Sequence, residues 1–175
     1  SLYPNNDGKF NEESQINFFD NNDYPYAYSK YITEKKINEN FPSNKILHLR
    51  VAQIIGNQKD TSIITNLKRE IKKKNKLSIF GNGKRVLNLI HVKKIPLYID
   101  LSLKKKLFGI YNISDYSFSL KKIAEVIKKK YGNKNTKILY KRKNKFNPRF
   151  IIDNKKFFSK LRLKKLSLND LINEI

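Results

Sequence analysis

The spacing of apolar residues along the chain predicts amphipathic helices. Between residues 63 and 74 the isoleucines and leucine recur at helical intervals, and basic residues occupy the opposite face. Ser119 can cap a second helix of this kind, and Gly132 can end it. Its apolar face holds Leu120, Ile123, Ala124, Ile127 and Tyr131. A third helix is predicted from the apolar face made by Val92, Ile95, Ile99 and Leu103, with Pro96 tolerated only in its first turn.

Other apolar stretches have the pattern of strands. The run from Ile46 to Gly56 is mostly apolar, which predicts one buried strand that ends at the glycine. We interpret His48, within this run, as a core residue. Residues 109–114 and 137–140 predict two shorter strands.

A tyrosine-rich stretch predicts a further helix, from residue 24 to about Asn40. Asp23 can cap it, and Pro25 fits its first turn, where a residue has no intrahelical partner for its N–H group. Tyr26 and Lys30 stand four residues apart, so both side chains lie on one face of this helix.

This spacing suggests acid–base chemistry. A free tyrosine has a pKa of about 10 and is therefore a poor base at neutral pH. A neighbouring ammonium favours the phenolate, which can take a proton from a sugar or alcohol hydroxyl. On spacing alone, a surface helix that carries one aromatic ring and one solvated charge is the better explanation of Tyr26 and Lys30.

Composition limits the class of protein. The chain has 175 residues, 39% of them hydrophobic, which suits one domain or one lobe of a larger one and is enough for a core. The absence of cysteine excludes disulfides, thiolate chemistry and cysteine metal sites, and we predict no metal site. No apolar run approaches the roughly 18–20 residues that span a bilayer, and we expect a cytoplasmic protein without a membrane partner.

The net charge of +23 raises the alternative of a nucleic-acid-binding protein. The lysines are spread through most segments, however, and few aromatic residues are interleaved for stacking on bases. We therefore interpret most of these charges as solvated helix faces, expect no nucleic-acid partner, and expect some lysines to attract an anionic substrate.

The residues around the Tyr/Lys pair form a longer motif. Pro25, Tyr26, Ser29, Lys30 and Glu34 give the pattern Pro-Tyr-x-x-Ser-Lys-x-x-x-Glu. This pattern closely resembles the catalytic helix of the extended short-chain dehydrogenase/reductase family, the NAD-dependent nucleotide-sugar epimerases and dehydratases. Further blocks resemble the family in the same order, so the resemblance covers nearly the whole chain.

The resemblance implies an α/β fold, the C-terminal part of a Rossmann-type parallel sheet domain plus a small α/β substrate-binding lobe. Residues 1–56 would complete the NAD-binding domain, a helix at about 92–105 would pack back on it, and residues 57–175 would form the nucleotide-sugar lobe. If Tyr3 matches the family's upstream tyrosine, the catalytic serine or threonine and the glycine-rich phosphate turn precede Ser1, although Pro4 replaces the usual glycine. We therefore expect this chain alone neither to bind NAD tightly nor to turn over substrate.

The resemblance also assigns roles at the cofactor. Tyr26 and Lys30 would be catalytic and would contact NAD, with NADP as the alternative, and Val51 and Ile54 would border the cofactor. Gln53 replaces the asparagine of the family's Leu-Arg-x-x-Asn-x-x-Gly strand. Its amide would bind a sugar or phosphate oxygen, or would simply be a polar residue satisfied at a strand end.

Together with Gln53, three further residues would bind the substrate, a nucleoside diphosphate sugar. Phe80 belongs to a Leu-x-Ile-Phe-Gly-x-Gly element whose aromatic residue packs against the nucleotide base in the family. Arg85 would reach the diphosphate and would compensate for Leu87, which occupies the usual arginine position. Arg149, in a closing Pro-Arg-x-x-x-Asp-x-x-Lys block, would also contact the diphosphate or would be an ordinary surface charge.

These assignments imply an epimerase-type oxidoreductase of cell-envelope polysaccharide biosynthesis. Dehydratases of the family usually carry glutamate where this chain has Ser1, which favours a 4-epimerase over a 4,6-dehydratase. A reductase or decarboxylase of the same superfamily and a non-catalytic binding fragment remain alternatives. The full-length protein could also form a homodimer.

Overall fold

The structure is a computed structural model that describes residues 2–17, 19, 24–56, 62–142, 148–164, 166–168 and 170–171. Its strands are β1 (Gly8–Phe10), β2 (Leu47–Val51), β3 (Gln53–Ile55), β4 (Lys76–Phe80), β5 (Val86–His91), β6 (Gly109–Ile113), β7 (Tyr116–Ser119), β8 (Lys137–Lys141) and β9 (Phe150–Ile152). Its helices are α1 (Tyr24–Asn40), the 3₁₀ turn η1 (Ser43–Lys45), α2 (Ile63–Lys74), α3 (Lys94–Lys104), α4 (Leu120–Tyr131) and α5 (Lys155–Leu161).

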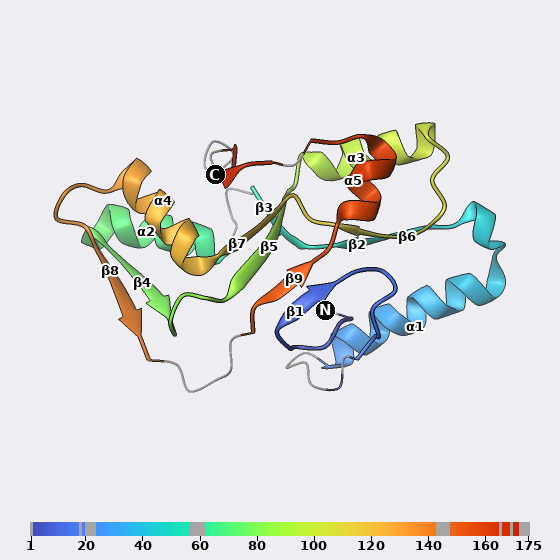
Figure 1. Cartoon of the computed structure of the whole chain (residues 1–175), viewed down its shortest axis with the longest axis horizontal. Helices are drawn as coiled ribbons and strands as arrows, with labels where there is room; N and C mark the ends of the chain where they lie inside the picture. Colours follow the sequence, from blue (N-terminus) through green and yellow to red (C-terminus); the bar gives the residue numbers. More distant parts are fainter. Residues whose placement is uncertain are drawn as a thin grey trace.

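The strands pair mainly in parallel (Figure 1). β2 pairs with β6, β4 with β8 and β1 with β9, each in parallel. β5 lies between β3, which is parallel to it, and β7, which is antiparallel. Only Ala52 separates β2 from β3, so one extended stretch of chain joins two of these sheets.

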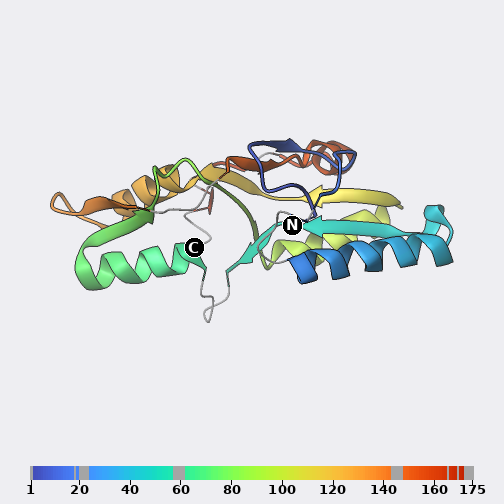
Figure 2. The same cartoon turned by 90° about the horizontal axis from the view of Figure 1, so that it is seen from below.

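Helices cover the sheets at both ends of an elongated molecule. Figures 1 and 2 show α2 and α4 beside β4 and β8 at one end, and α1 and α3 beside β2 and β6 at the other. One hydrophobic core lies between α2, α4 and the neighbouring strands, with Leu77, Ile79 and Leu89 fully buried in it. A second cluster, called here the aromatic core, consists of Ile90, Tyr98, Tyr111, Ile113, Phe157, Phe158 and Leu161.

The α/β architecture predicted from the sequence is confirmed. The helices expected over residues 24–40, 63–74 and 120–131 are α1, α2 and α4, and the two short strands are β6 and β8. Ser119 caps α4 as predicted, because its hydroxyl accepts the Lys122 N–H at 3.3 Å. The predicted Asp23 cap lies outside the described residues, and the division into two parts at residue 56 stays a prediction.

The prediction of one buried strand from Ile46 to Gly56 was wrong in two respects. The stretch is interrupted at Ala52, because β2 pairs with β6 whereas β3 pairs with β5. It is also only partly buried, since Val51 is 39% exposed and Ile54 is 50% exposed. In the part of the chain that the structure describes, β2 pairs on one edge alone, which explains its incomplete cover.

The predicted apolar face of the third helix was also wrong. α3 begins at Lys94, and its buried residues are Tyr98 and Ser102, whereas Ile99 is 39% exposed and Leu103 is 66% exposed. Tyr98 lies inward because its hydroxyl donates to Asp115 Oδ1 at 2.6 Å and its ring packs edge-on against the aromatic core. Polar contacts between distant segments therefore rotate the helix away from its most apolar stripe.

Gly56 occupies a position where a larger residue is expected to destabilise the fold. Its φ is +100°, and an added Cβ would lie 2.2 Å from Nε2 of buried His91. Gly109 has a similar φ of +96° but nothing within 4 Å of its Cβ position, so Gly109→Ala is a matched control for backbone strain alone. We expect Gly56→Ala to lower the free energy of unfolding by about 2 kcal/mol more than Gly109→Ala does. Urea denaturation measures both variants, and equal losses would contradict the clash.

Candidate active site

A cavity of about 810 Å³ lies where the N-terminal segment, α1, β2 and the start of β5 meet. Its size is within the range typical of small-molecule sites. Its polar lining comprises Tyr3, Asn5, Tyr26, Lys30, Thr33, Glu34, His48, Arg50, Gln53, Arg85, Asn88 and Asn112. Its apolar lining comes mainly from Ala27, Leu49, Val51, Ala52, Val86, Leu87 and Phe150.

The first half of α1 presents the phenol and the ammonium to this cavity. Pro25 stands in the first turn, and Ala27, 1% exposed, turns the inner side of the helix toward the sheet. Lys30 Nζ lies 5.3 Å from the centroid of the Tyr26 ring, within the range of a cation–π contact. Tyr26 is 54% exposed, so its ring remains accessible to a ligand.

The structure brings five of the predicted site residues to the cavity: Tyr26, Lys30, Val51, Gln53 and Arg85. They come from α1, from the stretch shared by β2 and β3, and from the segment just before β5, so three separate parts of the sequence converge here. Both Gln53 and Arg85 have exposed side chains, which leaves their amide and guanidinium groups open to a ligand.

Three other predicted residues do not line the cavity. Ile54 follows Gln53 in β3 and therefore points to the opposite face of the sheet. Phe80 is 48% exposed at the end of β4, where Lys141 Nζ lies 5.8 Å from its ring centroid. Arg149 is exposed between Pro148 and Phe150, which do line the cavity.

A buried polar network, which the sequence analysis did not identify, forms part of the cavity wall. Arg50 Nε and Nη2 donate to the two carboxylate oxygens of Glu34 at 3.0 and 2.6 Å. Arg50 Nη1 donates to the Tyr3 hydroxyl at 2.9 Å, and that hydroxyl donates to Asn112 Oδ1 at 2.7 Å. The signal in the sequence was the position of Glu34, one further turn along the face that carries Tyr26 and Lys30.

Burial and hydrogen bonding together set the protonation of this network. It raises the pKa of Tyr3, and the hydrogen bond and charge of Arg50 offset the increase only in part, so Tyr3 is a neutral donor at pH 7. Burial also opposes the charge of Arg50, but its hydrogen bonds to Glu34 and Tyr3 outweigh that effect and raise its pKa. Glu34 neutralises the charge of Arg50. Two other cationic side chains of the cavity lining, Lys30 and Arg85, have no acidic partner within the described residues.

His48 also lines the cavity, although the sequence analysis interpreted it as a core residue. It is half-buried on β2, and one ring nitrogen, Nε2, lies 2.9 Å from Asn38 Oδ1 on α1. This contact gives α1 a second polar attachment to β2.

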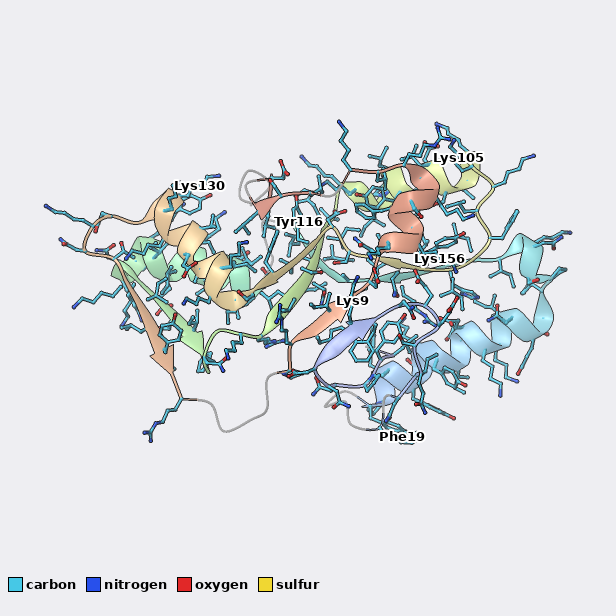
Figure 3. The ribbon with its side chains drawn as sticks, in the orientation of Figure 1. Lys9, Phe19, Lys105, Tyr116, Lys130 and Lys156 are labelled. Carbon is cyan, nitrogen blue, oxygen red and sulfur yellow. The ribbon has the colours of Figure 1, made fainter. Side chains whose placement is uncertain are left out.

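Asp153, which follows β9, makes the fold sensitive to acid. Burial disfavours its carboxylate, but Lys9, 2.8 Å away and labelled in Figure 3, and the Lys155 N–H outweigh burial and lower its pKa. A carboxyl group whose pKa is lower in the folded state stabilises the fold above its unfolded pKa of about 3.9, and this contribution is lost as the pH falls further. We expect Asp153→Asn to flatten the pH dependence of unfolding free energy below about pH 5. Urea unfolding at pH 3–7 measures this, and an unchanged pH profile would contradict it.

Within the described ranges, the structure contains no cluster of three or more histidine, aspartate or glutamate side chains that could hold a metal ion. Nor is any helix of that part of the chain long and apolar enough to cross a bilayer.

Comparison with known proteins identifies the family and the fold. A model of the "NAD dependent epimerase/dehydratase family" matches residues 1–114. A comparison with curated proteins returned no match.

Solved structures of nucleotide-sugar enzymes share the fold. The ADP-L-glycero-D-manno-heptose-6-epimerase of Helicobacter pylori is 16% identical with a TM-score of 0.78, over 98% of this chain and 56% of that one. The UDP-glucuronic acid 4-epimerase of Bacillus cereus, solved with UDP-glucuronic acid and NAD, is 21% identical with a TM-score of 0.76, over 99% and 57%. The dTDP-glucose 4,6-dehydratase of Bacillus anthracis, solved with NAD, is 19% identical with a TM-score of 0.68, over 95% and 55%. The chain thus spans little more than half the length of these neighbours.

Proposed function

Because the chain belongs to the NAD-dependent epimerase/dehydratase family, we propose that it carries the proton-transfer and sugar-binding side of a nucleotide-sugar epimerase. One observation carries this proposal. Tyr26 and Lys30 are in contact in the wall of a cavity of substrate size, with exposed Arg85 in the lining of the same cavity.

In this proposal Tyr26 is the catalytic base. As a phenolate it takes the proton of a sugar hydroxyl, and it returns the proton when the keto group is reduced again. Lys30, 5.3 Å from the ring centroid, stabilises the negative charge on the phenolate.

The same cavity wall fits the nicotinamide riboside end of NAD. Ala27, Val51 and Ala52 supply an apolar surface, and Lys30, whose ammonium has no acidic partner within the described residues, supplies a donor for ribose hydroxyls. When bound, NAD would accept a hydride from the sugar carbon and give it back. The contact between Ile54 and the cofactor stays a prediction, as does the use of NAD in preference to NADP.

The substrate would be a nucleoside diphosphate sugar. Arg85 offers a planar set of donors that suits two phosphate oxygens at once, and Gln53 offers an amide for a sugar hydroxyl. The roles of Phe80 at the base and Arg149 at the diphosphate stay predictions, because neither residue lines the cavity.

Epimerisation is proposed over dehydration on the strength of Ser1, which stands where the family's dehydratases usually have glutamate and which lies outside the described residues. In an epimerase the keto-sugar turns over before the hydride returns, whereas in a reductase it leaves. A reductase or decarboxylase is therefore the nearest alternative within the superfamily.

Nucleic-acid binding is the alternative from another class, and the net charge of +23 favours it. The lysines are spread through most segments of the chain, however. Figure 3 shows Lys105, Lys130 and Lys156 on different helical segments, near the ends of α3 and α4 and on α5.

Titration separates the two functions. UDP-glucuronic acid and a duplex DNA are titrated into the protein at two salt concentrations, with NAD present and absent. Saturable sugar-nucleotide binding that survives the higher salt supports the proposal. If the protein binds DNA with an affinity that falls steeply with salt and does not bind the sugar nucleotide, nucleic-acid binding is its function and the epimerase proposal is rejected.

A further inference from the structure

We infer that Glu34 and Arg50 are positioning residues, which fix the roll of α1 so that Tyr26 and Lys30 face the cavity. The inference concerns the geometry of this chain, and its consequence for catalysis rests on the proposed function. The ion pair itself is bidentate, with both carboxylate oxygens of Glu34 engaged by the guanidinium.

Three of the α1 residues that line the cavity stand in one row along the helix. Tyr26, Lys30 and Glu34 are spaced by four residues, and all three are in the lining. Consecutive residues of an α-helix are about 100° apart around its axis. A rotation of α1 by that angle would therefore turn all three side chains away from the cavity together. Whatever holds Glu34 therefore also determines where the phenol and the ammonium point.

Apolar packing alone holds α1 weakly. Ala27 is its one buried residue, although all of its residues are described, and an alanine offers little contact area. The Glu34–Arg50 pair is much better enclosed, with side-chain exposures of 13% and 10%. A charged pair this enclosed is costly to separate, because a buried charge would be left without its partner.

Arg50 is in turn fixed to the sheet. It lies on β2 opposite Asn112 on β6, and Tyr3 links the two side chains through its hydroxyl. Asn112 is anchored further, because its side-chain amide donates to the Phe10 and Asp153 carbonyls at 3.3 and 3.2 Å. The guanidinium is thus a rigid, planar reference against which the roll of α1 is set.

The same helix contains a matched control. Glu39 forms an ion pair with Lys36 at 3.3 Å, but their side chains are 43% and 69% exposed, and neither residue lines the cavity. Glu39→Gln removes a charge from α1 as Glu34→Gln does, without disturbing the attachment to β2.

The geometry can be tested without any turnover. The protein is labelled with ¹³Cζ-tyrosine, the Tyr26 signal is assigned from Tyr26→Phe, and Lys30→Met gives the signal of a Tyr26 that has lost its ammonium. We expect Glu34→Gln to move the Tyr26 signal most of the way to its position in Lys30→Met, and Glu39→Gln to leave it in place. Arg50→Lys, which keeps the charge but loses the planar set of donors, should give an intermediate shift.

Two results would overturn the inference. The first is a Tyr26 signal in Glu34→Gln that matches the wild type. The second is loss of the folded circular-dichroism spectrum in both Glu34→Gln and Arg50→Lys, because the pair would then maintain the fold and not the helix face.

Kinetics add a readout that depends on the proposed function. In the active protein, Glu34→Gln should lower kcat by about tenfold to hundredfold while KM for the nucleotide sugar changes less than about threefold, and Glu39→Gln should leave both unchanged. If the Tyr26 signal is displaced in Glu34→Gln but the full-length wild-type protein is inactive with NAD and nucleotide sugars, the positioning role stands and the proposed function is rejected. Normal kcat with a displaced signal would reject the catalytic consequence.

Discussion

Replacing Tyr26 with phenylalanine in the full-length protein is expected to lower kcat for a nucleotide sugar by about 10²–10⁴-fold in the presence of NAD, while the Kd for the sugar nucleotide stays within about threefold. The substitution removes only the hydroxyl oxygen, the atom that takes the proton in the proposed reaction. The ring next to Lys30 remains, so the shape of the cavity wall is retained.

Tyr28→Phe is the matched control. Tyr28 stands on the same helix and is 45% exposed, close to the 54% of Tyr26, but it does not line the cavity. Steady-state kinetics and calorimetric titration measure both variants. Near-normal turnover in Tyr26→Phe would remove this residue from the mechanism.

The largest loss of stability is expected from Phe157→Ala. Phe157 is fully buried at the centre of the aromatic core, with ring centroids of Tyr98 and Tyr111 at 5.5 and 5.9 Å in edge-on contacts. Removing its ring leaves a cavity among aromatic neighbours from α3, β6 and α5, at a cost of about 3–5 kcal/mol of unfolding free energy.

An exposed phenylalanine provides the comparison for this second prediction. Phe108 is 46% exposed just before β6, and Phe108→Ala should change the unfolding free energy by less than about 1 kcal/mol. Chemical denaturation of both variants gives the difference. Similar losses at the two positions would show that Phe157 is not the centre of this core.

Local patterns in the sequence were sufficient to predict several elements. α2 and α4 each have a regular apolar stripe, and the Ser119 cap predicted for α4 forms, since Ser119 accepts the Lys122 N–H group. α2 has a serine cap that was not predicted, in which Ser62 accepts the Thr65 N–H group. Information within one helix length was enough in these cases. The motif on α1 likewise placed Tyr26 and Lys30 together, because i,i+4 spacing alone determines which residues share a helix face.

Contacts between distant segments could not be predicted in the same way. β1 and β9 are three-residue strands that pair with each other across a sequence separation of more than a hundred residues. The inward position of Tyr98 depends on a hydrogen bond to Asp115 in a different element. Such pairings leave no periodic signal in the sequence.

The candidate site was predicted in part for the same reason. Gln53 and Arg85 reach the cavity because a strand end and a turn place them at its rim. Phe80 and Arg149 were assigned by motif, and the structure places them outside the lining. The pairing of Glu34 with Arg50 requires knowledge of how α1 packs on β2, which no local pattern contains.

The most direct test of the account is a crystal structure of the protein with UDP-glucuronic acid bound. If Tyr26 is the catalytic base, a hydroxyl of the sugar ring will lie about 2.6–3.2 Å from the Tyr26 hydroxyl, and Arg85 will contact the diphosphate. A sugar ring bound elsewhere, with the Tyr26 hydroxyl facing bulk solvent, would contradict it.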